Sequence, residues 1–158
     1  MKIILPFAFI VLFIDQIIKL FIVSKLSLGV TNSMIPHFLN FTYVQNEGAA
    51  FSTFLGGRIF LIFVSLFSLF FIYYYFIKNQ KMTKFKIFLN SLLIGGVLGN
   101  MIDRIFRGYV VDYLDFSLLE YHFPIFNFAD ICIVISCFIL LYLTLKEDSN
   151  GNKSSNRK

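Results

Sequence analysis

The chain has 158 residues, of which 58% are hydrophobic, and it contains 22 Phe and 8 Tyr but no Trp. Its mean hydropathy of +0.77 excludes a soluble domain, because a soluble fold of this length needs a far more polar surface. The net charge of +5 could suit nucleic acid, but the basic residues cluster beside apolar segments, which favours a topology signal and predicts no nucleic-acid partner. We expect one integral membrane domain over residues 1–145 and a polar tail over 146–158.

Four segments can cross a bilayer, for which roughly 20 apolar residues are needed. They cover residues 3–23, 59–77, 85–105 and 126–145. The first could be a cleavable signal peptide, but Asp15 and Lys19 interrupt its apolar stretch and no small-x-small cleavage site follows. We therefore expect a retained helix there, and an all-α membrane protein with four transmembrane helices.

The first connection, residues 24–58, contains a β-prone stretch at 38–46. Its alternation places Leu39, Phe41 and Tyr43 on one face, which we expect to face lipid or substrate. The sequence NEGAA at 46–50 then supplies a turn and small residues where a chain can approach closely. We predict a small extracytoplasmic β-sheet between the first two helices; the alternative is an amphipathic loop without a catalytic role.

The orientation follows from the basic residues. With four alternating spans, only Lys25, Arg58 and Arg107 flank one side. The other side carries Lys2, Lys78, Lys81, Lys84, Lys86, Lys146, Lys153, Arg157 and Lys158. This asymmetry predicts that both termini and the turn at 78–86 are cytoplasmic, and that the tail is a disordered cytoplasmic end.

In this topology every charge inside a span occupies the outer half of the membrane, and further polar residues lie on the same side. The residues concerned are Asp15 and Lys19 in the first span, Asn100, Asp103 and Arg104 in the third, Asn127 and Asp130 in the fourth, and Asp112 and Asp115 in the connection between the last two. Ionised groups in hydrocarbon are costly and usually functional. We therefore predict a site that opens outward.

Asp112 and Asp130 are the candidate catalytic pair, because neither has a cation four residues away to explain it structurally. Two adjacent carboxylates share one proton, so that one can take a proton from water while the other polarises a carbonyl. This is aspartic-protease chemistry, and it predicts no metal and no cofactor. The residues predicted to hold the scissile backbone or stabilise the oxyanion are Asn46, Asn100, Asn127 and Arg104.

Structural roles are predicted for the other polar residues. Asp15, Lys19 and Asp103 can hold helices together through ion pairs, and Asp115 is placed with them as polar support. Asp103 is also a tempting third catalytic residue, but the neighbouring Arg104 favours an ion pair. Asp103 and Arg104 can neutralise each other or pair with Asp15 and Lys19. A stripe of small residues, Gly95, Gly96 and Gly99, predicts close helix packing.

Two other functions stay open at this point. Asp103, Asp112, Asp115 and Asp130 could bind Mg²⁺ for phosphoryl chemistry, although lipid phosphotransferases of that sort usually act at the cytoplasmic surface. A small membrane scaffold or transporter subunit could also carry polar residues in its spans. Transport predicts charges through the full depth of the membrane, and none is found in the inner half.

Five motifs in order resemble those of bacterial lipoprotein signal peptidase (signal peptidase II), over nearly the whole chain. They are DQIIK at 15–19, NEGAAF at 46–51, GGVLGNMIDR at 95–104, VVDYLDF at 110–116 and FNFAD at 126–130. The resemblance implies an aspartyl endopeptidase of the bacterial cytoplasmic membrane that cuts prolipoproteins just before a diacylglyceryl-modified cysteine in a lipobox.

The resemblance also assigns residues and partners. It makes Asp112 and Asp130 the catalytic dyad, makes Asp15 and Lys19 a supporting pair, and adds Gly48 to the substrate-positioning residues. It implies lipidated prolipoproteins as substrates, contact with membrane lipid, and inhibition by cyclic peptides of the globomycin type. We expect a monomer, although the glycine stripe could serve dimerisation as well as packing within one chain.

Overall fold

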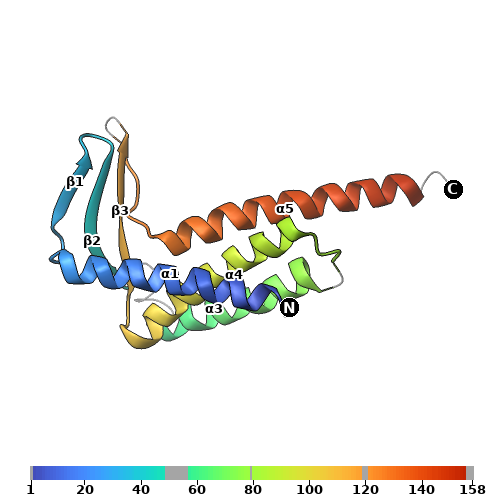
Figure 1. The fold of residues 1–158 in the computed structure, drawn as a ribbon, viewed down its shortest axis with the longest axis horizontal. Helices are drawn as coiled ribbons and strands as arrows, with labels where there is room; N and C mark the ends of the chain where they lie inside the picture. Colours follow the sequence, from blue (N-terminus) through green and yellow to red (C-terminus); the bar gives the residue numbers. More distant parts are fainter. Residues whose placement is uncertain (1, 49–56, 79, 119–120, 156–158) are drawn as a thin grey trace.

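The computed structural model describes residues 2–48, 57–78, 80–118 and 121–155, and it consists of a bundle of helices with a β-sheet across one end (Figure 1). The helices are α1 (Ile4–Lys25), α3 (Gly57–Ile72) with its π-helical continuation η1 (Tyr73–Ile77), α4 (Lys84–Phe106) and α5 (Phe128–Ser155). The strands are β1 (Thr31–Ile35), β2 (Leu39–Asn46), β3 (Val110–Leu118) and β4 (Tyr121–His122). The N-terminus, the C-terminus and the α3–α4 connection all lie at the end opposite the sheet. The sidedness of this arrangement in the cell stays a prediction.

All four predicted spans are helices long and apolar enough to cross a membrane. α5 nevertheless extends beyond its predicted span, and residues 146–155 have a helical backbone where the sequence predicts a disordered tail. Adding turns to an existing helix costs little compared with nucleating one. In addition, Lys86 Nζ in α4 bonds Glu147 Oε2 at 2.6 Å and holds the first turn of this extension.

α4 is the central helix, because α1, α3 and α5 all pack on it. In its most apolar window 61% of the residues are buried, compared with 17–22% in the other three spans. It is also the least hydrophobic span. These properties belong together, since a helix surrounded by protein can carry polar groups that lipid would not tolerate. The other helices turn large apolar side chains outward, including Phe13, Phe67 and Phe138.

The glycine stripe of α4 allows the close packing that the sequence predicts. A Cβ added at Gly95 would lie 2.7 Å from the backbone oxygen of Ala8 in α1. One at Gly96 would lie 2.7 Å from the backbone oxygen of Ala129 in α5. The stripe therefore lets two neighbouring helices, α1 and α5, approach α4 closely within a single chain.

We expect Gly96→Ala to destabilise the protein by about 1–3 kcal/mol, because the added methyl group meets backbone rather than a side chain that can move. The sign of the change in stability tests the close contact. At a helix position with free space, Ala is about 1 kcal/mol better than Gly. Thermal unfolding in detergent measures the change, and an unchanged or raised Tm would contradict the close contact.

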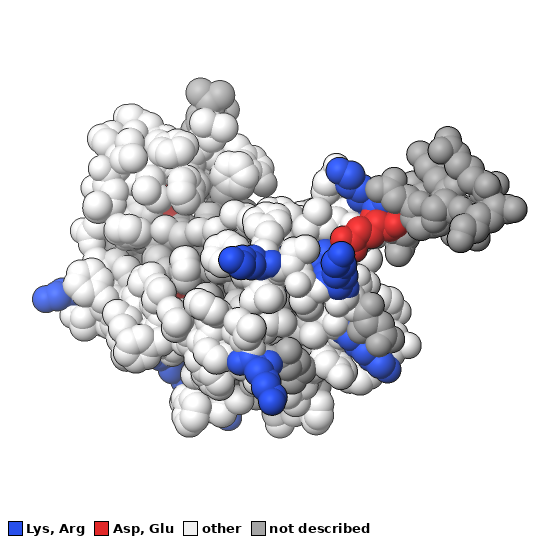
Figure 2. Space-filling view, turned by 45° about the vertical axis from the view of Figure 1, so that its right-hand side comes forward, with Lys and Arg blue, Asp and Glu red and all other residues white. Residues whose placement is uncertain are grey.

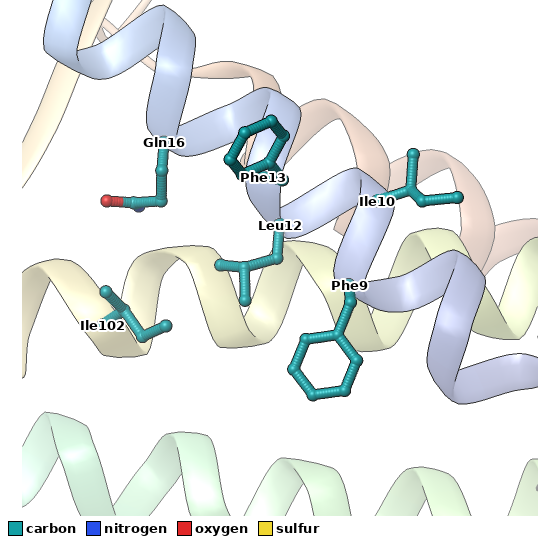
Figure 3. Close-up of a pocket in the computed structure, with 6 residues that line it drawn as sticks. All are labelled: Phe9, Ile10, Leu12, Phe13, Gln16 and Ile102. Atoms are coloured by element: carbon teal, nitrogen blue, oxygen red, sulfur yellow. The ribbon is translucent and has the colours of Figure 1, made fainter.

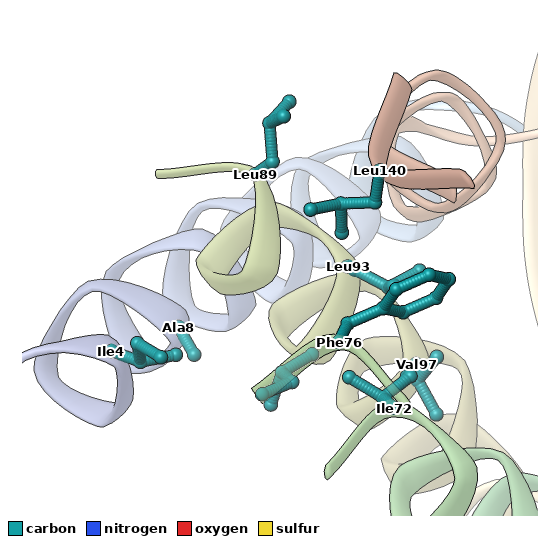
Figure 4. Packing of buried hydrophobic residues seen from close by; sticks show 9 residues of the cluster. Ile4, Ala8, Ile72, Phe76, Leu89, Leu93, Val97 and Leu140 are labelled. Carbon is teal, nitrogen blue, oxygen red and sulfur yellow. The ribbon is translucent and has the colours of Figure 1, made fainter. Parts of the chain in front are cut away.

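The largest apolar core lies at the end of the bundle away from the sheet (Figure 4). It contains Ile4, Ala8, Ile72, Phe76, Leu89, Leu93, Ile94, Val97 and Leu140. A second, smaller cluster joins the end of α1 to the sheet through Ile22, Tyr43, Val111 and Tyr113. Between the two clusters lie Asp15 and Lys19 of α1 and Asn100 and Asp103 of α4, all buried, whereas Lys86, Asn90 and Ser91 are buried polar residues of α4 at the end away from the sheet.

The sheet is larger than predicted, since only two of its strands come from the first connection. The strand order is β1-β2-β3-β4 with antiparallel pairs, and β3 and β4 come from the connection between α4 and α5. β3 is rich in β-branched and aromatic residues and completes the free edge of β2, which places Asp112 opposite Val44. The predicted aromatic face of β2 is partly internal, because Tyr43 is only 5% exposed and packs against Ile22.

Candidate active site

The two candidate carboxylates come from neighbouring elements at the sheet end of the bundle. Asp112 lies in β3 and is 2% exposed, whereas Asp130 lies in the first turn of α5 and is half-buried. Two amide side chains join them. Asn127 Nδ2 donates to Asp112 Oδ1 at 2.6 Å, and Asn100 Nδ2 donates to Asp130 Oδ1 at 2.7 Å. The four residues form one hydrogen-bonded cluster.

Asn127 links helix capping to this cluster. It directly precedes α5, where its Oδ1 accepts the backbone N–H of Asp130 at 3.0 Å, while Asp130 Oδ2 accepts the backbone N–H of Asn127 at 3.1 Å. This reciprocal arrangement is a capping box. Because the amide oxygen is used by the cap, the amide nitrogen is directed to Asp112. The spacing Asn-x-x-Asp before an apolar run is a capping signal that our sequence analysis missed.

Lys19 orients Asn100 in a comparable way. Its ammonium donates to Asn100 Oδ1 at 2.9 Å, so the amide nitrogen of Asn100 faces the other way, toward Asp130. Lys19 is fully buried, so no water competes for this bond. A residue predicted only as structural support therefore also determines which group Asn100 presents to the carboxylate.

The supporting ion pairs tie four elements together. Lys19 Nζ lies 2.9 Å from both Asp15 Oδ2 and Asp103 Oδ2, and all three side chains are fully buried. Asp15 Oδ1 also accepts the N–H of Ala129 in α5 at 3.2 Å, and Asp103 Oδ2 accepts the N–H of Val111 in β3 at 3.1 Å. The predicted support role thus has a definite geometry, which anchors the strand and the helix that carry the candidate pair.

The pairing of the arginines differs from the prediction. Asp103 pairs with Lys19 and with Arg107, which is one turn away on the same helix face, rather than with the adjacent Arg104. Arg104 instead interacts electrostatically with Asp130, Asp112 and Asp103, and its Nη1 donates to the backbone oxygen of Asn100 at 3.2 Å. Its Nε is buried without a partner among the described residues. Arg104 is therefore available to the candidate site.

Gln16 has no predicted role, although a polar residue inside a span is itself a signal. Gln16 Nε2 bonds Asp15, the backbone oxygen of Gly99 and Asp103 at 3.1–3.2 Å, and its Oε1 accepts from Arg107 at 3.0 Å. It closes the α1 side of the ion network.

Asn46 approaches Asp112 from the sheet. Its Nδ2 donates to Asp112 Oδ2 at 2.8 Å, while its Oδ1 accepts the N–H of Gly48 at 2.9 Å. Gly48 has φ +70°, a conformation that favours glycine. Residues 49–51 of the NEGAAF motif lie outside the described residues. Asp115 is separate from this cluster, since its carboxylate accepts from Thr42 Oγ1 at 2.7 Å within the sheet.

Asp112 has an unusual pKa for an aspartate. Burial raises the pKa of Asp112 from 3.8 to about 6, and the nearby charge of Asp130 adds to the rise. Hydrogen bonds from Asn46 and Asn127 oppose it, because they favour the carboxylate. Asp112 is therefore suited to hold or release a proton near physiological pH.

The raised pKa predicts a pH-dependent stability. The stabilising effect of proton uptake at Asp112 is fully present below about pH 4 and is lost as the pH rises through about 6. Relative to Asp112→Asn, which cannot titrate, we expect the wild type to lose on the order of 3 kcal/mol of unfolding free energy between pH 4 and 7. Paired unfolding curves in detergent measure the difference, and a difference that does not vary with pH would rule out the shift.

Two cavities, one apolar and one partly polar, adjoin the candidate pair. One, of about 490 Å³, reaches Asp130 and is otherwise apolar, with Phe123, Phe126 and Ile131 in its wall. The other, of about 390 Å³, reaches Asp112 and includes Asn46 and Glu47. One carboxylate thus borders an apolar space, and the other borders a polar one beside the sheet.

The four acidic residues considered for Mg²⁺ do not converge. Asp103 is held by Lys19 and Arg107, and Asp115 is held by Thr42. Within the described ranges, no three His, Cys, Asp or Glu side chains gather as metal ligands. The geometry that brings Asp112 and Asp130 together therefore leaves the other two acids in structural positions.

Comparison with known proteins identifies the family. Residues 7–146 match the model of the family described as signal peptidase (SPase) II. The chain belongs to the signal peptidase II family. Lipoprotein signal peptidases of Staphylococcus aureus strains JH9 and Newman are each 40% identical over 142 residues, which cover 90% of this chain and 86% of theirs.

Solved structures agree with this signal peptidase II assignment. A bacterial membrane enzyme determined in meso at 2.3 Å superposes with a TM-score of 0.81 at 36% identity, over 95% of this chain and 92% of that one. A second, at 1.9 Å, gives 0.80 at 36% identity over 92% and 93%. The predicted family is confirmed: the chain is an aspartic peptidase and a multi-pass bacterial membrane protein. The phosphotransferase, scaffold and transporter alternatives are therefore dropped.

Proposed function

We propose that the protein removes signal peptides from diacylglyceryl-modified prolipoproteins by cutting just before the lipidated cysteine, with Asp112 and Asp130 activating water. Membership of the signal peptidase II family supports signal-peptide cleavage of prolipoproteins. The observation that carries the dyad is the hydrogen-bonded cluster in which Asn127 and Asn100 each donate to one carboxylate. No other acidic pair among the described residues combines this contact with two adjoining cavities.

In this mechanism the two carboxyl groups hold one proton between them. The ionised carboxylate takes a proton from water, whose oxygen adds to the scissile carbonyl carbon, while the protonated carboxyl donates to the carbonyl oxygen. The tetrahedral intermediate then loses the C–N bond as a proton passes to the leaving amine. Arg104 follows Asn100 by one turn of α4, and its guanidinium offers positive charge to the developing oxyanion.

Substrate positioning is proposed for Asn46, Gly48, Asn100, Arg104 and Asn127. The apolar cavity beside Asp130 suits the hydrocarbon of a lipidated precursor, and the polar cavity beside Asp112 suits entry of water. A cyclic peptide of the globomycin type is expected to compete for the same space. We propose a monomer, since the glycines of α4 are used within the chain.

The sheet end is proposed to face out of the cell. The basic side chains Lys2, Lys78, Lys81 and Lys84 belong to the opposite end, as expected for cytoplasmic termini. Labelling of single cysteines introduced at Ser33 in β1 and at Lys81 in intact cells tests this, after removal of the two natural cysteines. Only the position in β1 should react with a membrane-impermeant thiol reagent.

The activity is tested with purified protein in detergent and a lipobox precursor carrying a diacylglyceryl cysteine. We expect cleavage before that cysteine at the same rate with and without EDTA, because the proposed chemistry uses no metal. The same precursor without the lipid is the control and should be cut at least about 10²-fold more slowly, since its hydrocarbon contacts are missing. Loss of activity in EDTA that Mg²⁺ restores would overturn the proposal.

A further inference from the structure

A second apolar groove runs along α1 with α4 as its floor, and α3 with η1 forms the facing wall of its first part. We call it the α1–α3 groove. Its first part is a cavity of about 240 Å³ between Ile4 and Leu5 of α1, Tyr73 and Ile77 of η1, and Ile94 and Leu98 of α4. It lies in the half of the bundle away from the sheet, and none of its lining residues belongs to the candidate active site.

The groove continues toward the sheet as a cavity of about 540 Å³ (Figure 3). Its lining comes from α1 and α4 alone: Phe9, Leu12 and Gln16 point from α1 toward α4, where Ile102 lies, and Ile10 and Phe13 complete the lining. The two cavities follow one stripe, because Leu5, Phe9, Leu12 and Gln16 have helical spacing on α1, as do Ile94, Leu98 and Ile102 on α4. From Leu5 to Gln16 the stripe is about 17 Å long, which matches one half of a bilayer's hydrocarbon core.

Basic side chains flank the mouth of the groove at the end of the bundle away from the sheet. Lys2 precedes Ile4 by two residues and Lys78 directly follows Ile77; both are exposed. Lys78 Nζ lies 4.9 Å from the ring centre of Tyr74, so an aromatic ring supports the ammonium at the membrane boundary. The space-filling view shows basic side chains gathered toward the end of the bundle from which α5 projects (Figure 2).

This positive charge has little acidic compensation. Among the described side chains at this end, the only acid is Glu147, and it is paired with Lys86. Lys2, Lys78, Lys81, Lys84 and Lys146 therefore present a net positive surface at the membrane boundary. A negatively charged headgroup is attracted to such a surface by about 1 kcal/mol for each basic residue near it.

We propose that the α1–α3 groove binds one anionic phospholipid of the surrounding bilayer, with its phosphate between Lys2 and Lys78 and one acyl chain along the groove. A peptide helix does not fill the groove, because the two cavities together would hold only roughly 10 Å of a helix that is 10 Å across, whereas the stripe is about 17 Å long. A single hydrocarbon chain fits the narrow, apolar wall. This site is independent of the catalytic roles of Asp112 and Asp130.

The end of the bound acyl chain that is farthest from the headgroup would reach Gln16. That residue bonds Asp15, Asp103 and Arg107 in the ion network behind the candidate pair. A lipid that binds the folded protein and not the unfolded chain stabilises the folded state. We therefore expect the anionic lipid to raise the Tm of the protein as well as to occupy the groove.

The absence of Trp permits a specific test. Tyr73→Trp places a single fluorophore in the groove, and Phe138→Trp places one on α5, where Phe138 is 70% exposed. Each variant is reconstituted in phosphatidylcholine vesicles containing a small fraction of either acyl-brominated phosphatidylglycerol or acyl-brominated phosphatidylcholine. We expect the anionic lipid to quench Trp at 73 about fivefold more effectively, and both lipids to quench Trp at 138 equally.

Variants that remove equal charge distinguish a specific lipid site from general attraction of anionic lipid to the basic surface. In the Tyr73→Trp background, Lys2→Gln with Lys78→Gln should abolish the preference, whereas Lys81→Gln with Lys84→Gln removes equal charge from the same end and should preserve it. Unfolding curves check that each variant folds. Equal quenching by both lipids, or equal loss in both variants, would overturn the proposal. Trp at 73 that no lipid quenches would also overturn it and indicate a protein occupant.

Discussion

Replacing Asp112 or Asp130 by Asn is expected to lower kcat for a lipidated precursor at least about 10³-fold, with the protein still folded. Each substitution removes a group that must carry a proton in the proposed mechanism, and general acid–base catalysis is typically worth about 10²–10⁴-fold. Asn nearly preserves the shape of the side chain and keeps one of the two acceptor oxygens, so the bond from Asn46 to residue 112 or from Asn100 to residue 130 is retained while the bond from Asn127 is lost. Single-turnover cleavage of the purified variants measures the loss.

The chain contains a matched control for this experiment. Asp115 lies three residues after Asp112 in the same strand, but its carboxylate bonds Thr42 within the sheet. Asp115→Asn should therefore keep kcat within about threefold of wild type, since this partly buried hydrogen bond in the sheet contributes only about 1 kcal/mol to stability. Full activity of Asp112→Asn or Asp130→Asn would refute the dyad.

The double variant adds a further check. Two groups that act as one unit do not have additive effects on catalysis. Asp112→Asn with Asp130→Asn should be no slower than the slower single variant, within error. Losses that multiply would mean that the two carboxylates act in separate steps and do not share a proton.

Lys19→Met should cost about 3–5 kcal/mol of unfolding free energy, the largest stability effect that we expect for an exchange of one side chain in this protein. The substitution leaves Asp15 fully buried without a cation, and it leaves Asp103 with Arg107 alone. Removing one partner of a buried ion pair is strongly destabilising because the other charge stays buried. It also frees Asn100 to rotate, so activity at permissive temperature should fall as well.

Two further variants test whether the unpaired buried carboxylate causes the loss of stability in Lys19→Met. Lys25→Met removes an exposed lysine in the last turn of the same helix and should leave both Tm and activity unchanged. Asp15→Leu combined with Lys19→Met removes both charges and should recover part of the lost stability, because replacing a buried ion pair by apolar residues is often tolerated. If the double variant is less stable than Lys19→Met, the unpaired carboxylate is not the reason for the loss.

The spans could be predicted from the sequence because the transfer of a helix into hydrocarbon depends on its own residues. The same reasoning failed at the end of α5, where a contact with Lys86 from a distant part of the chain supports additional helical turns. It failed again for β3, whose pairing with β2 joins residues 66 positions apart, such as Gln45 and Val111. Long-range pairing leaves only a weak mark in the local pattern.

In the candidate site, too, local features could be predicted from the sequence and long-range contacts could not. Asp112 and Asp130 were selected because no nearby cation explained them, and the structure brings them into one cluster. The cap of α5 at Asn127 could also have been found, since the capping box is a local motif. The role of Lys19 in orienting Asn100 could not, because it depends on how α1 is rotated against α4.

The sequence by itself determined that this is a four-span membrane protein, which end of the bundle holds its polar residues, and to which family it belongs. Only the tertiary structure decided which cation pairs with which acid. The nearest residue in the chain, Arg104, does not pair with Asp103; Lys19 and Arg107 do. The physical reason is that the polarity and length of a segment are local properties, whereas the rotation of a helix and the register of a strand are set jointly by all the packing contacts of the fold.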